Sequence, residues 1–246
     1  MIKTEFNQTT IAKSASLIGV GLHTGKNVTL TFKPAEENNG YTFKRIDLEG
    51  TPIIKADANF VTNTQRGTCL EKNGVTIQTC EHVLAALVGL QIDNVCIELD
   101  ASEPPIMDGS SKFFVEACET AGIVELAAKR EEYIVREVIT YRDEDTGSEI
   151  TVIPSSEYQV TTMVDFGTKV LGTQNATLDT LSDFKIEISD SRTFSFLHEI
   201  EMLLEHGLIK GGDLNNAIVY VDKELSQETM ERLKVAFKKD NIAVKP

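Results

Sequence analysis

The sequence predicts an α+β fold in which strands followed by helices occur twice. Its 246 residues allow one large domain or two ordinary ones. A composition of 41% hydrophobic and 25% charged residues is typical of a compact globular protein. Strand-like and helical patterns alternate in each half, and the charged residues 129–132 separate the halves. We therefore expect an N-terminal α+β domain of residues 1–128 and an incomplete C-terminal α+β domain of residues 129–246.

The strands and the first helix of the N-terminal half follow from hydrophobic spacing. Residues 28–32 alternate between apolar and polar side chains and predict a strand with one buried face. Residues 75–77 form a short strand-like stretch. Apolar residues at helical spacing then predict a helix over residues 81–88, with Gly89 placed where a C-cap would fit. Residues 95–99 predict the next strand.

Three further helices are indicated by capping residues and apolar spacing. One begins at Ser110 or Ser111 and ends near Gly122. Another covers residues 195–205, where apolar residues recur at helical spacing. Ser226 has the side chain of an N-cap and precedes the last helix.

Strand patterns in the second half occur over residues 134–140, 150–153, 158–166 and 217–221. Residues 242–244 resemble the start of one more strand. We therefore expect a further C-terminal segment for this strand to pair with.

Charge and hydropathy exclude several classes of function. The net charge is −14, from 38 acidic and 24 basic residues, which disfavours binding to nucleic acid or to an anionic membrane surface. No apolar run is long enough to span a membrane, and the first residues lack the apolar core of a signal peptide. We expect a cytoplasmic protein with reduced cysteines that pack in the core. The cysteines are Cys69, Cys80, Cys96 and Cys118.

Two motifs resemble known sites but do not fit them. Residues 19–26 are rich in glycine, yet they match neither the dinucleotide fingerprint nor the phosphate-binding loop, and we interpret them as a turn before a strand. His198 and Glu199 resemble the start of a zinc-protease motif, but Met202 occupies the position of the second histidine. A solvated helix face is the simpler interpretation.

Two other short segments carry residues suited to hydrolysis. Glu81 and His82 open a helix after a strand, where a histidine can bind zinc and a carboxylate can accept a proton from water. The same dipeptide also fits an ordinary solvated helix start. Thr193 precedes another helix, where a hydroxyl can donate to an oxyanion or simply cap the helix. From the residues alone, both alternatives stay open.

Six segments considered together resemble one family. They are residues 19–25, 79–87, 93–94, 103–110, 191–194 and 210–212. In this order they are similar to the UDP-3-O-acyl-N-acetylglucosamine deacetylases, or LpxC family, the zinc amidohydrolases that commit Gram-negative bacteria to lipid A synthesis. The resemblance implies two similar domains whose sheets sandwich the helices. It also implies Zn²⁺ as cofactor and an acylated UDP-N-acetylglucosamine as substrate.

The resemblance assigns roles to individual residues. His82 matches the first zinc ligand, Glu81 the general base, and Thr193 the residue that holds the oxyanion. Phe194 would lie beside Thr193 in the substrate pocket. A β-α-β insert at about residues 194–221 would form an apolar passage for the acyl chain. Its substrate-binding residues would be Leu197, Ile200, Ile209, Gly212, Leu214, Ala217 and Val219.

The remaining zinc ligands of the family have no match within these residues. The family's other His and Asp ligands, its catalytic Lys and its general-acid His would follow Pro246. Catalytic zinc sites of this type have three protein ligands, so the chain alone is expected to be inactive. A non-catalytic fragment that binds an acylated UDP-sugar is the alternative, and a phosphate-loop nucleotide enzyme is a third. We also expect a monomer, with a downstream dehydratase domain as a possible fusion partner.

Overall fold

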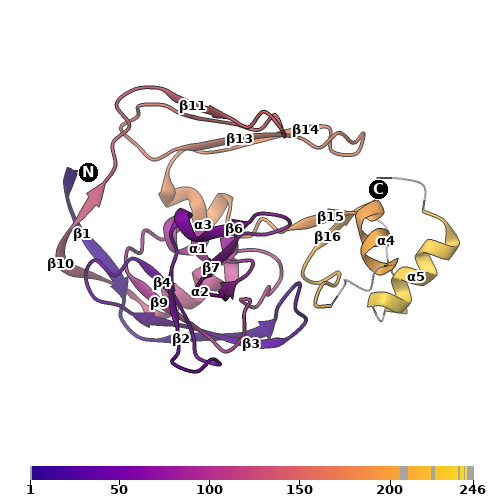
Figure 1. The fold of residues 1–246 in the computed structure, drawn as a ribbon. Helices are drawn as coiled ribbons and strands as arrows, with labels where there is room; N and C mark the ends of the chain where they lie inside the picture. The colour runs from indigo at the N-terminus through magenta and orange to yellow at the C-terminus, as the bar shows by residue number, and fades with distance from the viewer. Residues whose placement is uncertain (1, 206–209, 223–224, 238, 241, 243–246) are drawn as a thin grey trace.

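A computed structural model describes residues 2–205, 210–222, 225–237, 239–240 and 242 (Figure 1). Its five-stranded sheet has the order β2-β3-β9-β4-β5, in which β4 and β9 are parallel and the other neighbours antiparallel. The strands are β2 (Ala15–Val20), β3 (Asn27–Pro34), β9 (Val95–Leu99), β4 (Tyr41–Arg45) and β5 (Ile53–Lys55). This confirms the strands predicted at residues 28–32 and 95–99, and the α+β class.

Two helices, α1 (Glu81–Gly89) and α2 (Lys112–Ala121), pack against this sheet and each other. The ring of Phe32 on β3 meets that of Phe114 on α2 edge to face, with centroids 6.3 Å apart, a geometry that aromatic pairs prefer. Gly122 follows α2 with a φ of 77°, as predicted for its end. The packing of this core fixes the position at which α1 begins.

The predicted C-cap role of Gly89 is wrong. Helix α1 includes Gly89, and its C-cap is Leu90. A Cβ atom at Gly89 would overlap the ring of Phe184, which is buried in the same core. Phe184 begins the short helix α3 (Phe184–Glu187), which follows the 3₁₀ helix η2 (Leu181–Asp183). Gly89 is therefore required by the close approach of an aromatic ring from the second half of the chain.

A long strand pair lies beside this core. β1 (Ile2–Ile11) and β10 (Ile123–Glu132) are antiparallel with an irregular register. Arg130 on β10 forms an ion pair with Asp93 at 2.9 Å. The domain boundary predicted near residue 128 falls inside β10, so the charged residues 129–132 belong to a strand. The division into two similar domains whose sheets sandwich the helices stays a prediction.

A small three-stranded sheet precedes α1. It consists of β6 (Val61–Asn63), β7 (Cys69–Lys72) and β8 (Val75–Ile77), and it follows the 3₁₀ helix η1 (Ala58–Phe60). The strand predicted at residues 75–77 is confirmed. Asn73 and Gly74 join β7 to β8 with φ values of 53° and 77°, as a tight hairpin turn requires.

Of the four cysteines expected to pack in the core, Cys80 and Cys118 lie there, whereas Cys69 and Cys96 are half-buried. All four cysteines are free, and Cys80 and Cys118 are buried. Burial raises the pKa of the thiols of Cys80 and Cys118 to about 12. Within the ranges given above, no helix combines the length and the apolar character that crossing a membrane demands.

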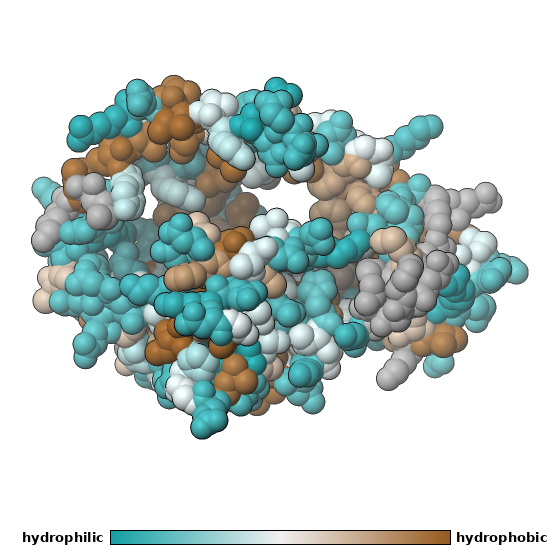
Figure 2. Space-filling view, in the orientation of Figure 1, coloured by the Kyte–Doolittle hydropathy of each residue, from teal (hydrophilic) through white to brown (hydrophobic). Residues whose placement is uncertain are grey.

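Two hairpins from the second half lie above the core in Figure 1. One joins β11 (Ile139–Arg142) to β12 (Glu149–Val152), and the other joins β13 (Val160–Asp165) to β14 (Thr173–Leu178). Almost every residue of these strands is exposed. Figure 2 shows apolar side chains along this arch and open space between it and the core. The strands predicted at residues 150–153 and 158–166 are confirmed as β12 and β13 with slightly different bounds, and both faces of these hairpins are exposed.

The strand predicted at residues 134–140 begins too early. β11 starts at Ile139, because Ile139 pairs with Val152, the last residue of β12, and a turn that begins at Asp143 joins the two strands. In that turn, the backbone N–H of Gly147 donates to the carbonyl of Asp143 at 2.8 Å, and the N–H of Asp145 donates to the Asp143 carboxylate at 2.9 Å.

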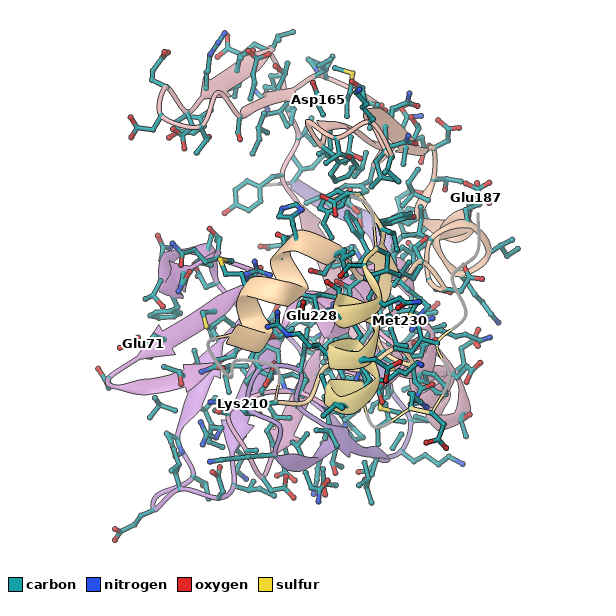
Figure 3. The ribbon with its side chains drawn as sticks, turned by 90° about the vertical axis from the view of Figure 1, so that its right-hand side faces the viewer. Glu71, Asp165, Glu187, Lys210, Glu228 and Met230 are labelled. Atoms are coloured by element: carbon teal, nitrogen blue, oxygen red, sulfur yellow. The ribbon has the colours of Figure 1, made fainter. Side chains whose placement is uncertain are left out.

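The last part of the chain contains two parallel strands and two helices. β15 (Phe194–Phe196) pairs with β16 (Ile218–Tyr220), and α4 (Leu197–Glu205) follows β15 directly. The helix predicted over residues 195–205 begins at 197, because the preceding residues pair with β16. Figure 3 shows α4 beside α5 (Gln227–Phe237), and a second apolar cluster joins these helices.

The predicted N-cap of α5 is confirmed, because the Ser226 hydroxyl accepts a hydrogen bond from the backbone N–H of Thr229 at 3.1 Å. We expect Ser226→Ala to lower the free energy of unfolding by about 1 kcal/mol, since one helix N–H loses its partner. Ser226→Asp should restore most of this loss, because aspartate caps equally well. Urea denaturation of both variants checks the prediction, and equal stability of Ser226→Ala and wild type would contradict it.

Candidate functional site

Glu81 and His82 form the first turn of α1, directly after the buried N-cap residue Cys80. The Cys80 side chain makes no capping hydrogen bond, and the N-terminus of the helix carries the positive end of its dipole. A carboxylate is favoured at this position. The Glu81 carboxylate is held by the backbone N–H of Thr68, which donates to Oε2 at 2.9 Å.

His82 is half-buried, and burial lowers the pKa of its imidazole below the usual value, while the nearby Glu81 and Asp108 carboxylates oppose that shift. Burial therefore favours the neutral imidazole, which is the form that binds a metal. The Ser111 hydroxyl donates to the His82 backbone carbonyl at 3.0 Å and ties this helical turn to α2.

Asp108 is a site residue to which the sequence analysis assigned no role. Its carboxylate accepts hydrogen bonds from the backbone N–H and hydroxyl of Ser110 at 3.1 and 2.6 Å. The guanidinium of Arg192 donates to its backbone carbonyl at 2.6 Å. In the sequence, Asp108 lies within the family-like segment 103–110 and in an Asp-Gly turn before a helix, and such turns are common.

Thr193 is hydrogen-bonded to Gly109, the residue that follows Asp108. The backbone N–H of Thr193 donates to the Gly109 carbonyl at 2.7 Å, and the Thr193 carbonyl accepts from Ile218 at 3.0 Å. Gly109 has a φ of 87°, and a Cβ atom there would overlap the carbonyl oxygen of Asn216. The structure therefore joins the Thr193 segment to the loop that places Asp108 beside His82.

Of the glycine-rich residues 19–26, Gly19 and Val20 end β2, and residues 21–26 form the turn predicted before a strand. The N–H of Gly25 donates to the Gly21 carbonyl at 2.9 Å, and Gly25 has a φ of 66°. This turn receives a loop from the second half, because the N–H of Gly211 donates to the Leu22 carbonyl at 3.1 Å. Lys210, labelled in Figure 3, lies against Gly25, where an added Cβ would approach the Lys210 Cβ to 2.9 Å.

A pocket of about 280 Å³ adjoins the start of α1. Its lining comes from the glycine-rich turn, the β6–β7 segment and the residues before α1: His23, Asn63, Gln65, Arg66, Gly67, Cys69, Gln78 and Thr79. Arg66 forms an ion pair with Glu199 of α4 at 3.3 Å, which links this pocket to the β15–α4 segment. A second pocket of about 340 Å³ lies by the β1–β10 pair, away from Glu81.

The residues predicted to line an acyl passage fall into different environments. Leu197 and Ile200 are 0% and 5% exposed, and they pack against Leu233 and Phe237 of α5. Phe194 is 37% exposed, and its ring contacts those of three other aromatic residues. Those residues are Phe166, Phe196 and Tyr220.

The other members of the predicted passage lie in or before β16. Gly212, Leu214, Ala217 and Val219 are half-buried. Ile209 lies outside the described residues. The acyl passage itself therefore stays a prediction.

The described part of the chain does not complete a metal site. Within it, no three His, Cys, Asp or Glu side chains come close enough together to hold an ion. His82 is half-buried with the Glu81 and Asp108 carboxylates nearby, and a catalytic zinc site needs three protein ligands. His198 pairs with Asp222 and stacks on Phe196, which agrees with its interpretation as part of a helix surface.

Comparison with known proteins gives one consistent match. Residues 8–238 match the family of UDP-3-O-acyl N-acetylglycosamine deacetylases, LpxC. The chain is 48% identical over 226 residues to the bifunctional enzyme LpxC/FabZ of Bacteroides thetaiotaomicron, covering 92% of this chain and 49% of that protein. It is 42% identical over 220 residues to the UDP-3-O-acyl-N-acetylglucosamine deacetylase of Myxococcus xanthus, covering 89% and 69% respectively. The chain thus spans about half the length of its bifunctional relatives.

Proposed function

Because the chain belongs to the LpxC family of UDP-3-O-acyl N-acetylglycosamine deacetylases, we propose that it forms part of a zinc-dependent hydrolase. Its substrate is UDP-3-O-(3-hydroxyacyl)-N-acetylglucosamine, and the reaction is the committed deacetylation of lipid A synthesis. One observation carries the proposal. Glu81 and His82 open a helix beside Asp108, and Gly109 joins this loop to Thr193.

In the proposed reaction, Glu81 takes a proton from the attacking water. The water oxygen bonds to the acetamide carbonyl carbon. The carbon–nitrogen bond then breaks as the proton held by Glu81 passes to the leaving nitrogen, which releases the amine and acetic acid, the latter ionised as acetate at neutral pH. The Thr193 hydroxyl donates to the oxyanion formed at that carbonyl, where such a donor stabilises the transition state. His82 is the zinc ligand that this chain contributes. The described residues offer no complete zinc site by themselves.

A second candidate function is binding without hydrolysis. It is supported by the described residues, in which no three His, Cys, Asp or Glu side chains come close enough together to hold an ion. The test is acetate release from the acylated UDP-sugar by the full-length protein, measured together with zinc content. We expect stoichiometric zinc and turnover. Tight binding of the substrate without acetate release would instead establish the binding function.

Several wider features belong to the same proposal. The relatives named as bifunctional support a fusion to a downstream dehydratase domain in the full-length protein. We further propose a cytoplasmic monomer. Reading the coding sequence after Pro246 tests the fusion and shows whether it supplies the other His, Asp and Lys side chains.

The acyl passage is tested by comparing Phe194 with Ile200. Phe194→Ala removes a partly exposed ring, so we expect a roughly 10- to 100-fold higher KM for the acylated substrate, the cost of losing one apolar contact. A substrate without the acyl chain should be little affected. Ile200→Ala leaves a cavity between α4 and α5, so it should cost about 2–5 kcal/mol of stability. A loss of the same size on both substrates in Phe194→Ala would refute its place in the passage.

A further inference from the structure

Glu103 is a fully buried carboxylate to which the proposed reaction gives no role. It lies in the loop between β9 and α2 and is 0% exposed. Its oxygens accept hydrogen bonds from the backbone N–H of His23 at 3.1 Å, the N–H of Thr24 at 2.9 Å and the Thr79 hydroxyl at 2.9 Å. Among the described residues, no cation pairs with it. Its buried oxygens are therefore satisfied by hydrogen bonds, without which burial would be costly.

These hydrogen bonds join two segments distant in the sequence. The first is the glycine-rich turn, which leaves just enough room for the carboxylate, because a Cβ at Gly21 would lie 2.6 Å from Glu103 Oε2. The second is Thr79, which has a φ of 51° although it is β-branched. Such a conformation is strained and must be held by its surroundings. The hydrogen bond to Glu103 is one of the contacts that hold it.

Thr79 leads directly to the proposed catalytic dipeptide. Gly67 lies between the two groups, because a Cβ there would be 3.3 Å from both Thr79 Oγ1 and Glu81 Oε1. The next residue, Thr68, donates its N–H to the Glu81 carboxylate. On the other side, the glycine-rich turn accepts the N–H of Gly211 at the Leu22 carbonyl. Glu103 thus connects the start of α1 to the loop from the second half.

We propose that Glu103 is a positioning residue for the deacetylase site. It holds the glycine-rich turn and Thr79 at a fixed separation, and through them it sets the placement of Glu81 relative to the docked Gly211 loop. Glu103 touches no reacting atom. This inference rests on the proposed deacetylase function for its activity test, and on the observed hydrogen bonds for its structural test.

The experiment uses the full-length protein and pairs Glu103→Gln with two variants at Thr79. Glutamine has the shape of glutamate, but its NH₂ group faces backbone N–H donors and cannot accept from them. Thr79→Val removes the hydroxyl at nearly constant volume, whereas Thr79→Ser retains it. We expect kcat to fall roughly 10- to 100-fold in Glu103→Gln, the effect of a small misplacement of catalytic groups. Thr79→Val should lose kcat, and Thr79→Ser should remain close to wild type.

Amide hydrogen exchange gives a readout that does not depend on activity. In Glu103→Gln, the amides of His23 and Thr24 should exchange faster while those of β3 and β9 keep their protection. The double variant with Thr79→Val should lose little more kcat than the worse single variant, since both remove the same hydrogen bond. If the wild type releases no acetate, the proposed function fails, but this exchange pattern still decides the positioning role.

Two results would overturn the proposal. One is unchanged exchange of the His23 and Thr24 amides in Glu103→Gln. The other is wild-type kcat in folded Glu103→Gln with only a lower Tm, which would give Glu103 a purely structural role. If Glu103→Gln does not fold, Thr79→Val decides, and wild-type kcat in that variant equally overturns the proposal.

Discussion

Replacing His82 with alanine in the full-length protein is expected to abolish zinc binding, whereas Glu81→Ala is expected to keep zinc and lose turnover. The two side chains are adjacent in the first turn of α1, but we assign them separate roles. A metal ligand determines the affinity for zinc, while a general base contributes about 10²- to 10⁴-fold to the rate of hydrolysis. Metal analysis and acetate release from the same purified samples measure both effects.

A matched control separates catalysis from the favourable charge at a helix start. Glu228 is an exposed acidic residue in the first turn of α5, as Glu81 is in α1. Glu228→Ala should lose at most about 1 kcal/mol of stability from the helix dipole and no activity. Equal zinc loss in Glu81→Ala and His82→Ala would exclude Glu81 as a base that acts apart from metal binding.

Local hydrophobic spacing was sufficient to predict β3, β9, α1 and α2 of the central core, but β2, β4 and β5 were not predicted. The alternation in β3 and the helical spacing in α1 both reflect one buried face, and both elements are confirmed. Strand β10 was missed because most of its residues are exposed, so no alternation marks it. Its partner β1 is at the other end of the first half. A strand stabilised mainly by pairing with a distant segment has little local signal.

The geometry of the site could be predicted from local sequence patterns even less well than the core. Glu81 and His82 have the sequence of any solvated helix start, and the resemblance to a family singled them out. What makes them a candidate site is contact over long sequence distances. Glu103 binds the turn that holds His23, and Gly109 binds the Thr193 segment. Neither contact has a periodic signal, since each joins irregular loops whose meeting depends on the whole fold.

The helix α4 illustrates a different limit of prediction from the sequence. Its amphipathic pattern predicts an apolar face, but a face that binds an acyl chain and a face that packs on another helix have the same spacing. The structure places Leu197 and Ile200 against α5. Only the three-dimensional arrangement distinguishes such packing residues from the partly exposed Phe194.

Gly109→Ala is expected to separate the Thr193 segment from the Asp108 loop and to disable the site. A methyl group there would overlap the Asn216 carbonyl oxygen and lie 3.1 Å from the Thr193 side chain. Overpacking of this kind typically costs about 1–3 kcal/mol, in addition to about 1–2 kcal/mol for alanine at a left-handed φ. Because Thr193 donates its N–H to the Gly109 carbonyl, kcat should fall at least about tenfold.

Gly74→Ala provides the matched control for backbone strain. Gly74 has a φ of 77°, close to the 87° of Gly109, but a Cβ atom at Gly74 would meet nothing within 4 Å. The control should therefore lose only about 1–2 kcal/mol of stability, which is the cost of the left-handed conformation for alanine, and it should keep full activity. Urea denaturation and acetate release by both full-length variants measure the difference. If Gly109→Ala were no less stable than Gly74→Ala and equally active, the contact between Gly109, Asn216 and Thr193 would have no part in assembling the site.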